Sequence, residues 1–90
     1  PADIEAGILI EESGIPPDLA KVLADMGARI RNLKGFGLNE GVSTRLLVYA
    51  GKLIASGLDP DISCRVAVRD VLTDDPDVGG SVADIINLYF

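Results

Sequence analysis

The sequence predicts an all-α fold, a compact bundle of four to five short helices in one domain over residues 1–90. Apolar residues recur at intervals of three and four along five segments. The only alternating run, residues 62–68, fits a helix equally well, so no strand is expected. The chain is 48% hydrophobic but only 4% aromatic, which predicts a core of Leu, Ile, Val and Ala.

The first helix is expected from about Ala2 to Glu12, and Ser13-Gly14 ends it. Its apolar residues on one face are Ile4, Ile8 and Leu9. Pro16-Pro17-Asp18 opens the second helix, in which Arg29, Arg31 and Lys34 suit the negative end of the helix dipole. The apolar stripe of the second helix comprises Leu19, Val22, Leu23, Met26, Ile30 and Leu33.

Three glycines within residues 35–41 predict a loop, and a third helix follows it. Ser43 is expected to be the N-cap of this helix, and Gly57 its C-terminal cap. The apolar residues of the third helix are Leu46, Leu47, Ala50, Leu53 and Ile54.

Asp59-Pro60 begins a fourth helix, whose apolar side comprises Ile62, Val66, Ala67 and Val71. A fifth helix follows Asp75-Pro76, with Asp75 as its cap, and carries Val78, Val82, Ile85, Ile86 and Tyr89 at helical spacing. Each glycine of Gly79-Gly80 disfavours a helix by about 1 kcal/mol. We therefore expect this last helix to be short, late-starting or mobile.

The charge balance excludes several functions. Eight Lys and Arg residues stand against 14 Asp and Glu, giving a net charge of −6. No basic stripe or set of stacking aromatics is present, so binding to nucleic acid or to anionic membranes is not expected. No apolar run approaches the roughly 18 residues of a membrane span, and no signal peptide is recognised. These observations predict a soluble, cytoplasmic protein.

The residues available for metal binding or nucleophilic catalysis are few. Cys64 is the only cysteine and the chain has no histidine, so neither an intrachain disulfide, a zinc site nor a Cys–His nucleophile is expected. We expect Cys64 to be a small buried residue. The acidic cluster of Asp74, Asp75 and Asp77 lacks the spacing of a calcium loop, so no metal site is predicted.

Residues 41–45 combine a loop glycine, a helix cap and an arginine in the first helical turn. A helix N-terminus offers unpaired N–H donors and a partial positive charge, and Arg45 adds a planar fork of donors that suits phosphate. The sequence leaves two interpretations open, a phosphate-binding arginine and a solvated one. Ser43 is expected to cap the helix in either case.

Two further observations concern partners and catalysis. Phe36 lies between two loop glycines, where it serves either as a docking anchor for a partner or as a cover for the edge of the core. The chain has no G-x-x-x-x-G-K-[ST] motif, so it cannot hydrolyse a nucleotide by the P-loop mechanism alone. No catalytic residue is therefore predicted within this chain by itself.

Three motifs resemble the C-terminal domain of the CbbQ/NirQ/NorQ proteins, which belong to the MoxR branch of AAA+ ATPases and have the gas-vesicle protein GvpN as a relative. They are G-x-G-L-x-E-G-V-S-T-R-L-L-V-Y-A over residues 35–50, L-I-A-x-G over residues 53–57 and L-T-D-D-P over residues 72–76. The match is dense from about Arg29 to Val78. The combination of S-T-R-L-L with L-T-D-D-P is more specific than either motif alone.

The resemblance implies that residues 1–90 form the C-terminal helical lid of a longer ATPase chain. It implies that Arg45 is the sensor 2 arginine, which reaches the γ-phosphate of ATP bound in a preceding AAA+ core, and that Ser43 caps its helix. It also implies ATP and Mg as cofactors of the full-length protein and none for this fragment. ATP hydrolysis is expected only from the full-length protein.

The same resemblance implies partners. Members of this family act as ring-forming, commonly hexameric ATPases with a von Willebrand factor A-domain protein such as CbbO or NorD. Their targets include Rubisco and nitric oxide reductase, and the sequence does not discriminate between these. The alternative interpretation is a free-standing acidic helical module that docks a partner protein, with Phe36 in its contact surface.

Overall fold

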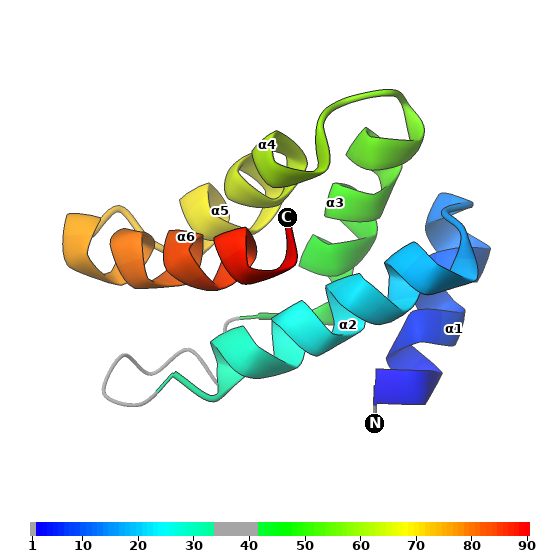
Figure 1. Cartoon of the computed structure of the whole chain (residues 1–90), viewed down its shortest axis with the longest axis horizontal. Helices are drawn as coiled ribbons and strands as arrows, with labels where there is room; N and C mark the ends of the chain where they lie inside the picture. The colour runs from blue at the N-terminus through cyan, green and yellow to red at the C-terminus, as the bar shows by residue number, and fades with distance from the viewer. Residues whose placement is uncertain (1, 34–41) are drawn as a thin grey trace.

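The computed structural model describes residues 2–33 and 42–90, which form helices and no strands, so the predicted all-α class is confirmed (Figure 1). The elements are α1 (Ala2–Ser13), α2 (Pro17–Arg31), α3 (Thr44–Ala55), α4 (Pro60–Cys64), the π-helical segment η2 (Arg65–Arg69), α5 (Asp70–Leu72) and α6 (Pro76–Tyr89). The segments α4, η2 and α5 follow one another without a break and together form the predicted fourth helix. The loop predicted over residues 35–41 lies outside the described residues.

Helices α2 and α3 form the centre of the bundle (Figure 1). Helix α1 packs against both of them on one side, and the unit made of α4, η2, α5 and α6 packs against them on the other. The first and last helices of the described chain, α1 and α6, therefore pack on opposite sides of the central pair (Figure 1).

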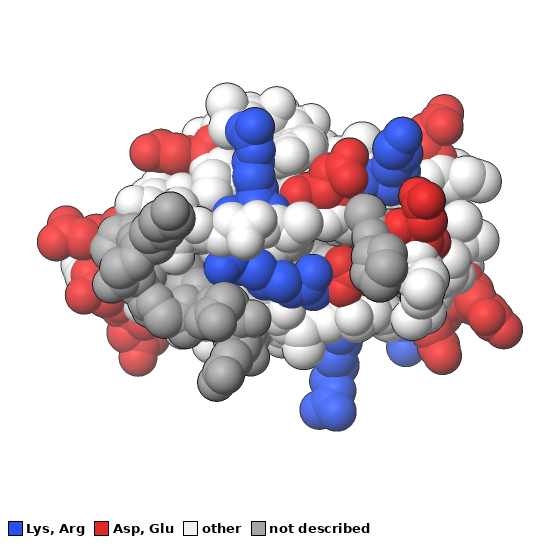
Figure 2. Space-filling model, turned by 90° about the horizontal axis from the view of Figure 1, so that it is seen from below, with Lys and Arg blue, Asp and Glu red and all other residues white. Residues whose placement is uncertain are grey.

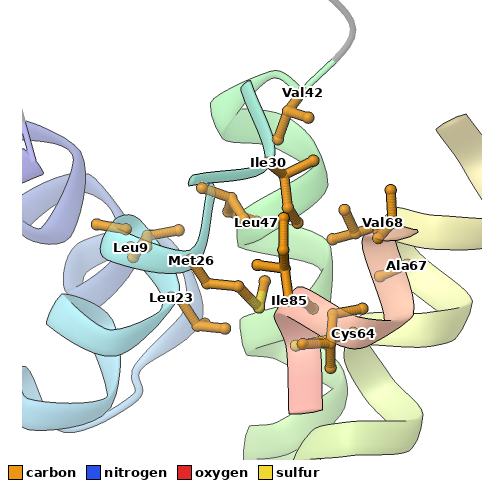
Figure 3. Packing of buried hydrophobic residues seen from close by; sticks show 14 of the residues in the cluster. Leu9, Leu23, Met26, Ile30, Val42, Leu47, Cys64, Ala67, Val68 and Ile85 are labelled. Atoms are coloured by element: carbon orange, nitrogen blue, oxygen red, sulfur yellow. The ribbon is translucent and has the colours of Figure 1, made fainter. Parts of the chain in front are cut away.

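The core is aliphatic, as the composition predicts, and all the long helices contribute to it (Figure 3). Its members include Met26 of α2, Leu47 of α3 and Ile85 of α6. The predicted stripes of the second, third and last helices are confirmed, since every member is buried or packed against the core or partly covered. Cys64 is fully buried within this cluster, as expected.

The predicted apolar face of the first helix is wrong for Ile4 and Ile8 and correct for Leu9. Ile4 and Ile8 are 64% and 40% exposed, whereas Leu9 is fully buried and Glu5 is buried beside it. Glu5 and Leu9 lie one turn apart and share the face that α1 presents to α2 and α3. The helix is rotated from the expected orientation because the carboxylate of Glu5 has a partner inside the bundle, described below.

The predicted apolar side of the fourth helix is also largely wrong. Ile62, Val66 and Val71 are exposed, and only Ala67 of the predicted set is buried. The face that packs against α3 and α6 instead carries Ser63, Cys64, Ala67 and Val68. Most of these side chains are small, so they allow close approach to α3. The π-helical turn of η2 also shifts the register of the residues after it.

Helix α6 corrects the expectation of a short or late-starting helix, because it runs from Pro76 to Tyr89 through both glycines. Its first turn is well capped. The Asp75 Oδ1 atom accepts hydrogen bonds from the backbone N–H of Asp77 at 2.8 Å and of Val78 at 3.4 Å, which confirms Asp75 as the N-cap. A cap of about 1 kcal/mol and a proline at the first helical position offset the cost of the glycines.

The C-terminus of α3 confirms the predicted role of Gly57. This residue has a φ of 106°, in the left-handed region that favours glycine. Its N–H donates to the carbonyl of Ile54 at 3.0 Å, and the N–H of Leu58 donates to the carbonyl of Leu53 at 3.1 Å. This pair of bonds is a Schellman motif, which ends the helix sharply before α4.

A set of polar contacts that the sequence does not predict joins three helices. The guanidinium of Arg31 donates from Nη1 to Glu5 Oε1 at 3.0 Å and from Nη2 to Glu5 Oε2 at 2.7 Å. Its Nε donates to the carbonyl oxygen of Val42 at 2.7 Å, and the hydroxyl of Thr44 donates to Glu5 Oε2 at 2.7 Å. We call Glu5, Arg31, Thr44 and the Val42 carbonyl the Glu5 clamp.

The clamp is partly buried and electrostatically matched. The side chains of Glu5 and Arg31 are 11% and 26% exposed. Burial by itself raises the pKa of Glu5, but the hydrogen bonds from Arg31 and Thr44 and the charge of Arg31 outweigh it, so the pKa lies below its usual value. The same hydrogen bond with Glu5 raises the pKa of Arg31. Both groups are therefore charged at neutral pH.

Replacing Glu5 with Gln is expected to destabilise the domain by about 1–3 kcal/mol at pH 7, because the half-buried guanidinium loses its counter-ion. Because the pKa of Glu5 is lower in the folded protein than its usual value of 4.5, the ion pair contributes its full stabilisation above pH 4.5. This stabilisation is lost as the pH falls through the pKa of Glu5 in the folded state. Urea unfolding of the wild type and of Glu5→Gln should therefore show that the difference between their free energies of unfolding shrinks from pH 7 to pH 3. Glu12→Gln, at an exposed position of the same helix, is the control. A difference that stays constant to pH 3 would contradict this account.

Replacing Gly51 with Ala is expected to destabilise the domain by about 1–2 kcal/mol, because the added Cβ lies 2.6 Å from Ser13 Oγ and 3.0 Å from Ser13 Cβ, where α3 approaches the end of α1. Gly80→Ala is the matched control, since a Cβ at that helical position meets no atom within 4 Å. It should stabilise the domain by about 0.5–1 kcal/mol through helix propensity. Thermal or urea unfolding measures both, and equal shifts in the two variants would refute the packing argument.

Candidate functional site at the start of helix α3

The N-terminus of α3 carries the candidate phosphate-binding residue. Arg45 is the second residue of this helix, and its side chain is exposed. Within residues 2–33 and 42–90, no hydrogen bond or ion pair engages its guanidinium. Three other arginines in the same part of the chain, at positions 31, 65 and 69, are each paired with a carboxylate. Arg45, like the exposed Arg29, therefore has no acidic partner among these residues.

Ser43 occupies the N-cap position, as predicted, with the extended backbone typical of a cap, at φ −87° and ψ 159°. The expected capping bond is absent, since its side chain makes no cap hydrogen bond. The hydroxyl of the next residue, Thr44, is directed to Glu5 instead. The helix start consequently has no side-chain cap, and its N–H groups and positive dipole end can attract an anion.

The chain has a net charge of −6, and side chains of both signs share its surface (Figure 2). Figure 2 shows Lys and Arg side chains across the middle of one face of the molecule, with some Asp and Glu side chains beside them and others at its two ends. The acidic residues that the sequence groups together have structural roles. Asp75 caps α6, and Asp77 lies in the first turn of that helix, where a negative charge is favourable.

The other candidate chemistries find no support among residues 2–33 and 42–90. Cys64 is a buried thiol, and burial together with the charge of Asp61 raises its pKa to about 12, so it is not a thiolate nucleophile at neutral pH. No group of three or more His, Cys, Asp or Glu residues in the described chain is placed to hold a metal ion. None of the described helices is long and apolar enough to cross a membrane. Phe36, the candidate docking residue, lies outside the described residues.

The surface of the described residues includes a larger and a smaller hollow. The larger, of about 640 Å³, is an open groove between η2 and α6, and its lining includes Arg65, Arg69 and Asp84. The smaller, of about 370 Å³, is lined by Glu5, Arg31 and Thr44 of the clamp together with Ile4, Ile8, Ala28 and Asn32. The smaller hollow therefore reaches the start of α3, directly before Arg45.

Sequence reasoning misses the Glu5 clamp. Glu5 lies 26 residues from Arg31 and 39 residues from Thr44 along the chain, and no local motif links them. Arg31 is predicted only as a cation near the end of a helix. The one available signal is that Glu5, the fourth residue of α1, has apolar neighbours in the sequence. Such a position is compatible with a buried ion pair, but it does not specify the partner of the glutamate.

Comparison with known proteins supports the resemblance seen in the sequence. Residues 5–89 match the family model described as CbbQ/NirQ/NorQ C-terminal. The protein CbbQ of Hydrogenophilus thermoluteolus is 50% identical over 76 residues, which cover 84% of this chain and 28% of the relative. The denitrification regulatory protein NirQ of Pseudomonas aeruginosa is 43% identical over 88 residues, covering 98% of this chain and 34% of the relative.

A third relative, the protein NorQ of Paracoccus denitrificans, is 40% identical over 86 residues, which cover 96% of this chain and 32% of the relative. The chain thus spans about a third of the length of the relatives that it matches. The family model matches nearly the whole chain, from the residue that begins the Glu5 clamp to the last residue of α6. On this evidence the chain belongs to the CbbQ/NirQ/NorQ C-terminal family.

Proposed function

We propose that this domain is the helical lid of a MoxR-type AAA+ ATPase and that Arg45 is its sensor 2 residue. In this proposal Arg45 contacts the γ-phosphate of ATP held by a preceding AAA+ core. The observation that carries the proposal is an exposed arginine, unengaged by any other described residue, in the first turn of a helix without a side-chain cap. Membership of the family, and relatives about three times as long as the chain, support a missing core.

The residues present fit half of a phosphate site. The guanidinium of Arg45 offers a planar set of donors, and the helix start adds N–H groups and a partial positive charge. The chain has no P-loop, so the remaining contacts belong to another domain. ATP with Mg²⁺, when bound there, supplies the triphosphate and its hydrolysable γ-phosphate bond.

Arg45 would then act as a sensor of the nucleotide state. It donates charge-assisted hydrogen bonds to an anion on the core and thereby holds the lid against it. When that anion is lost on hydrolysis, the attraction ends and the lid is released to a second position. Ser43 contributes to this site through its place at the helix start, rather than through a capping side chain.

The partners form the wider part of the proposal. The full-length protein is proposed to assemble as a hexameric ring in the cytoplasm and to work with a von Willebrand factor A-domain protein of the CbbO or NorD type. Its action is the remodelling or activation of an enzyme such as Rubisco or nitric oxide reductase. The name of the NirQ relatives, denitrification regulatory protein, is consistent with an activating role in that family.

In the full-length protein, Arg45→Ala is expected to lower kcat for ATP about 100- to 1,000-fold, as for other charge-stabilising donors. Circular dichroism and the unfolding midpoint should stay at the wild-type values, because the side chain is exposed. Arg29→Ala, at another exposed arginine, is the matched control and should retain activity. Activity near wild type for Arg45→Ala would exclude the sensor assignment.

The isolated 90-residue chain is expected to bind ATP with a Kd above about 1 mM, because one arginine and a helix start provide only part of a triphosphate site. Isothermal titration calorimetry with Mg-ATP measures this affinity. Micromolar binding by the isolated chain would contradict the lid proposal and favour a self-contained nucleotide site.

A further inference from the structure

The start of α3 is held on both sides of Ser43. Before it, the carbonyl oxygen of Val42 accepts a hydrogen bond from Arg31 Nε at 2.7 Å. After it, the hydroxyl of Thr44 donates to Glu5 Oε2 at 2.7 Å. The side chain of Val42 is itself buried in the core. The backbone that leads into Arg45 therefore has three attachments within three residues.

The geometry of these attachments requires an arginine at position 31. Its guanidinium uses all three of its nitrogen atoms at once, Nε toward Val42 and both terminal nitrogens toward Glu5. A planar fork can hold two chain segments in a defined relative orientation. A lysine ammonium is a point charge on a flexible stem, so it would keep the attraction to Glu5 but not this orientation.

The clamp does not itself present donors to the helix start. Both carboxylate oxygens of Glu5 accept hydrogen bonds, Oε1 from Arg31 and Oε2 from Arg31 and Thr44, where α1, α2 and α3 meet. The adjacent Arg45 is exposed. The clamp thus provides a counter-ion for a carboxylate that contacts Thr44, the residue directly before Arg45.

We propose that the Glu5 clamp positions Arg45, by setting the point at which α3 begins and hence the direction in which the Arg45 side chain leaves the helix toward a phosphate. Glu5, Arg31 and Thr44 are assigned as positioning residues, because their polar side-chain atoms bind one another and the Val42 carbonyl. This inference rests on the proposed function, because it needs Arg45 to be a phosphate contact. A misplacement of about 1 Å at such a contact lowers the rate by up to about 100-fold.

The test uses Arg31→Lys in the full-length protein, with two readouts. Amide hydrogen exchange of residues 44–47 should become about tenfold faster, whereas exchange of residues 82–86 in α6 should change less than twofold. In steady-state kinetics, kcat/KM for ATP should fall about tenfold. In an Arg45→Ala background, Arg31→Lys should cause no further fall, because the clamp acts through Arg45.

Arg65→Lys is the matched control. Arg65 donates to Asp61 Oδ1 at 2.8 Å and to Asn87 Oδ1 at 3.0 Å, and its side chain is 30% exposed, close to the 26% of Arg31. Arg65→Lys should lower the unfolding midpoint about as much as Arg31→Lys does, but it should leave amide exchange at residues 44–47 and kcat/KM for ATP unchanged. Thr44→Val should change amide exchange at residues 44–47 and kcat/KM for ATP in the same directions as Arg31→Lys, but by less. Thr44→Ser should match the wild type in both measurements, because it keeps the hydroxyl.

The outcomes separate this inference from the function on which it rests. Unchanged exchange at residues 44–47 in both Arg31→Lys and Thr44→Val would overturn the clamp as the anchor of α3. An equal fall in kcat/KM with and without Arg45 would overturn positioning through Arg45. Faster exchange in Arg31→Lys, combined with wild-type activity in Arg45→Ala, would overturn the sensor function and leave the clamp as an anchor of the fold only.

Discussion

The bidentate ion pair between Glu5 and Arg31 decides how three of the helices meet. It joins residues 26 positions apart in the chain, and through Val42 and Thr44 it extends to the start of α3. Neither charge is fully solvated, so each is stable in its place only while the other is present. The arrangement of α1, α2 and α3 therefore depends on a polar contact at the edge of an otherwise aliphatic core.

The consequences of this contact reach the surface. Because Glu5 turns inward with Leu9, the isoleucines at positions 4 and 8 are carried outward, beside the smaller of the two hollows. The core itself supplies little directional information, since branched aliphatic side chains pack in many orientations. A bidentate salt bridge has a defined geometry, and it selects one rotation of α1 from those that an aliphatic contact alone would allow.

The same contact relates the fold to the proposed function. An acidic domain offers a phosphate few favourable approaches, and a carboxylate near the helix start would attract Arg45 away from its ligand. The Glu5 carboxylate is instead occupied by Arg31 and Thr44, so Arg45 remains exposed. A lone arginine and a helix start form an incomplete phosphate site, which accords with a chain that spans about a third of the length of its relatives and with the proposal that an AAA+ core supplies the other contacts.

The sequence by itself determined the helices, because their signals are local. Gly57 ends α3 with a positive φ, Asp75 caps α6, and the apolar intervals of α2, α3 and α6 identify their buried stripes. Motifs around Arg45 also identified the family and the candidate residue. Only the tertiary structure decided which face of α1 and of the fourth helix is buried, and that Thr44 binds Glu5 while Ser43 makes no cap bond. Helical periodicity marks more than one apolar stripe on these segments, and the choice between them depends on partners that are distant in the chain.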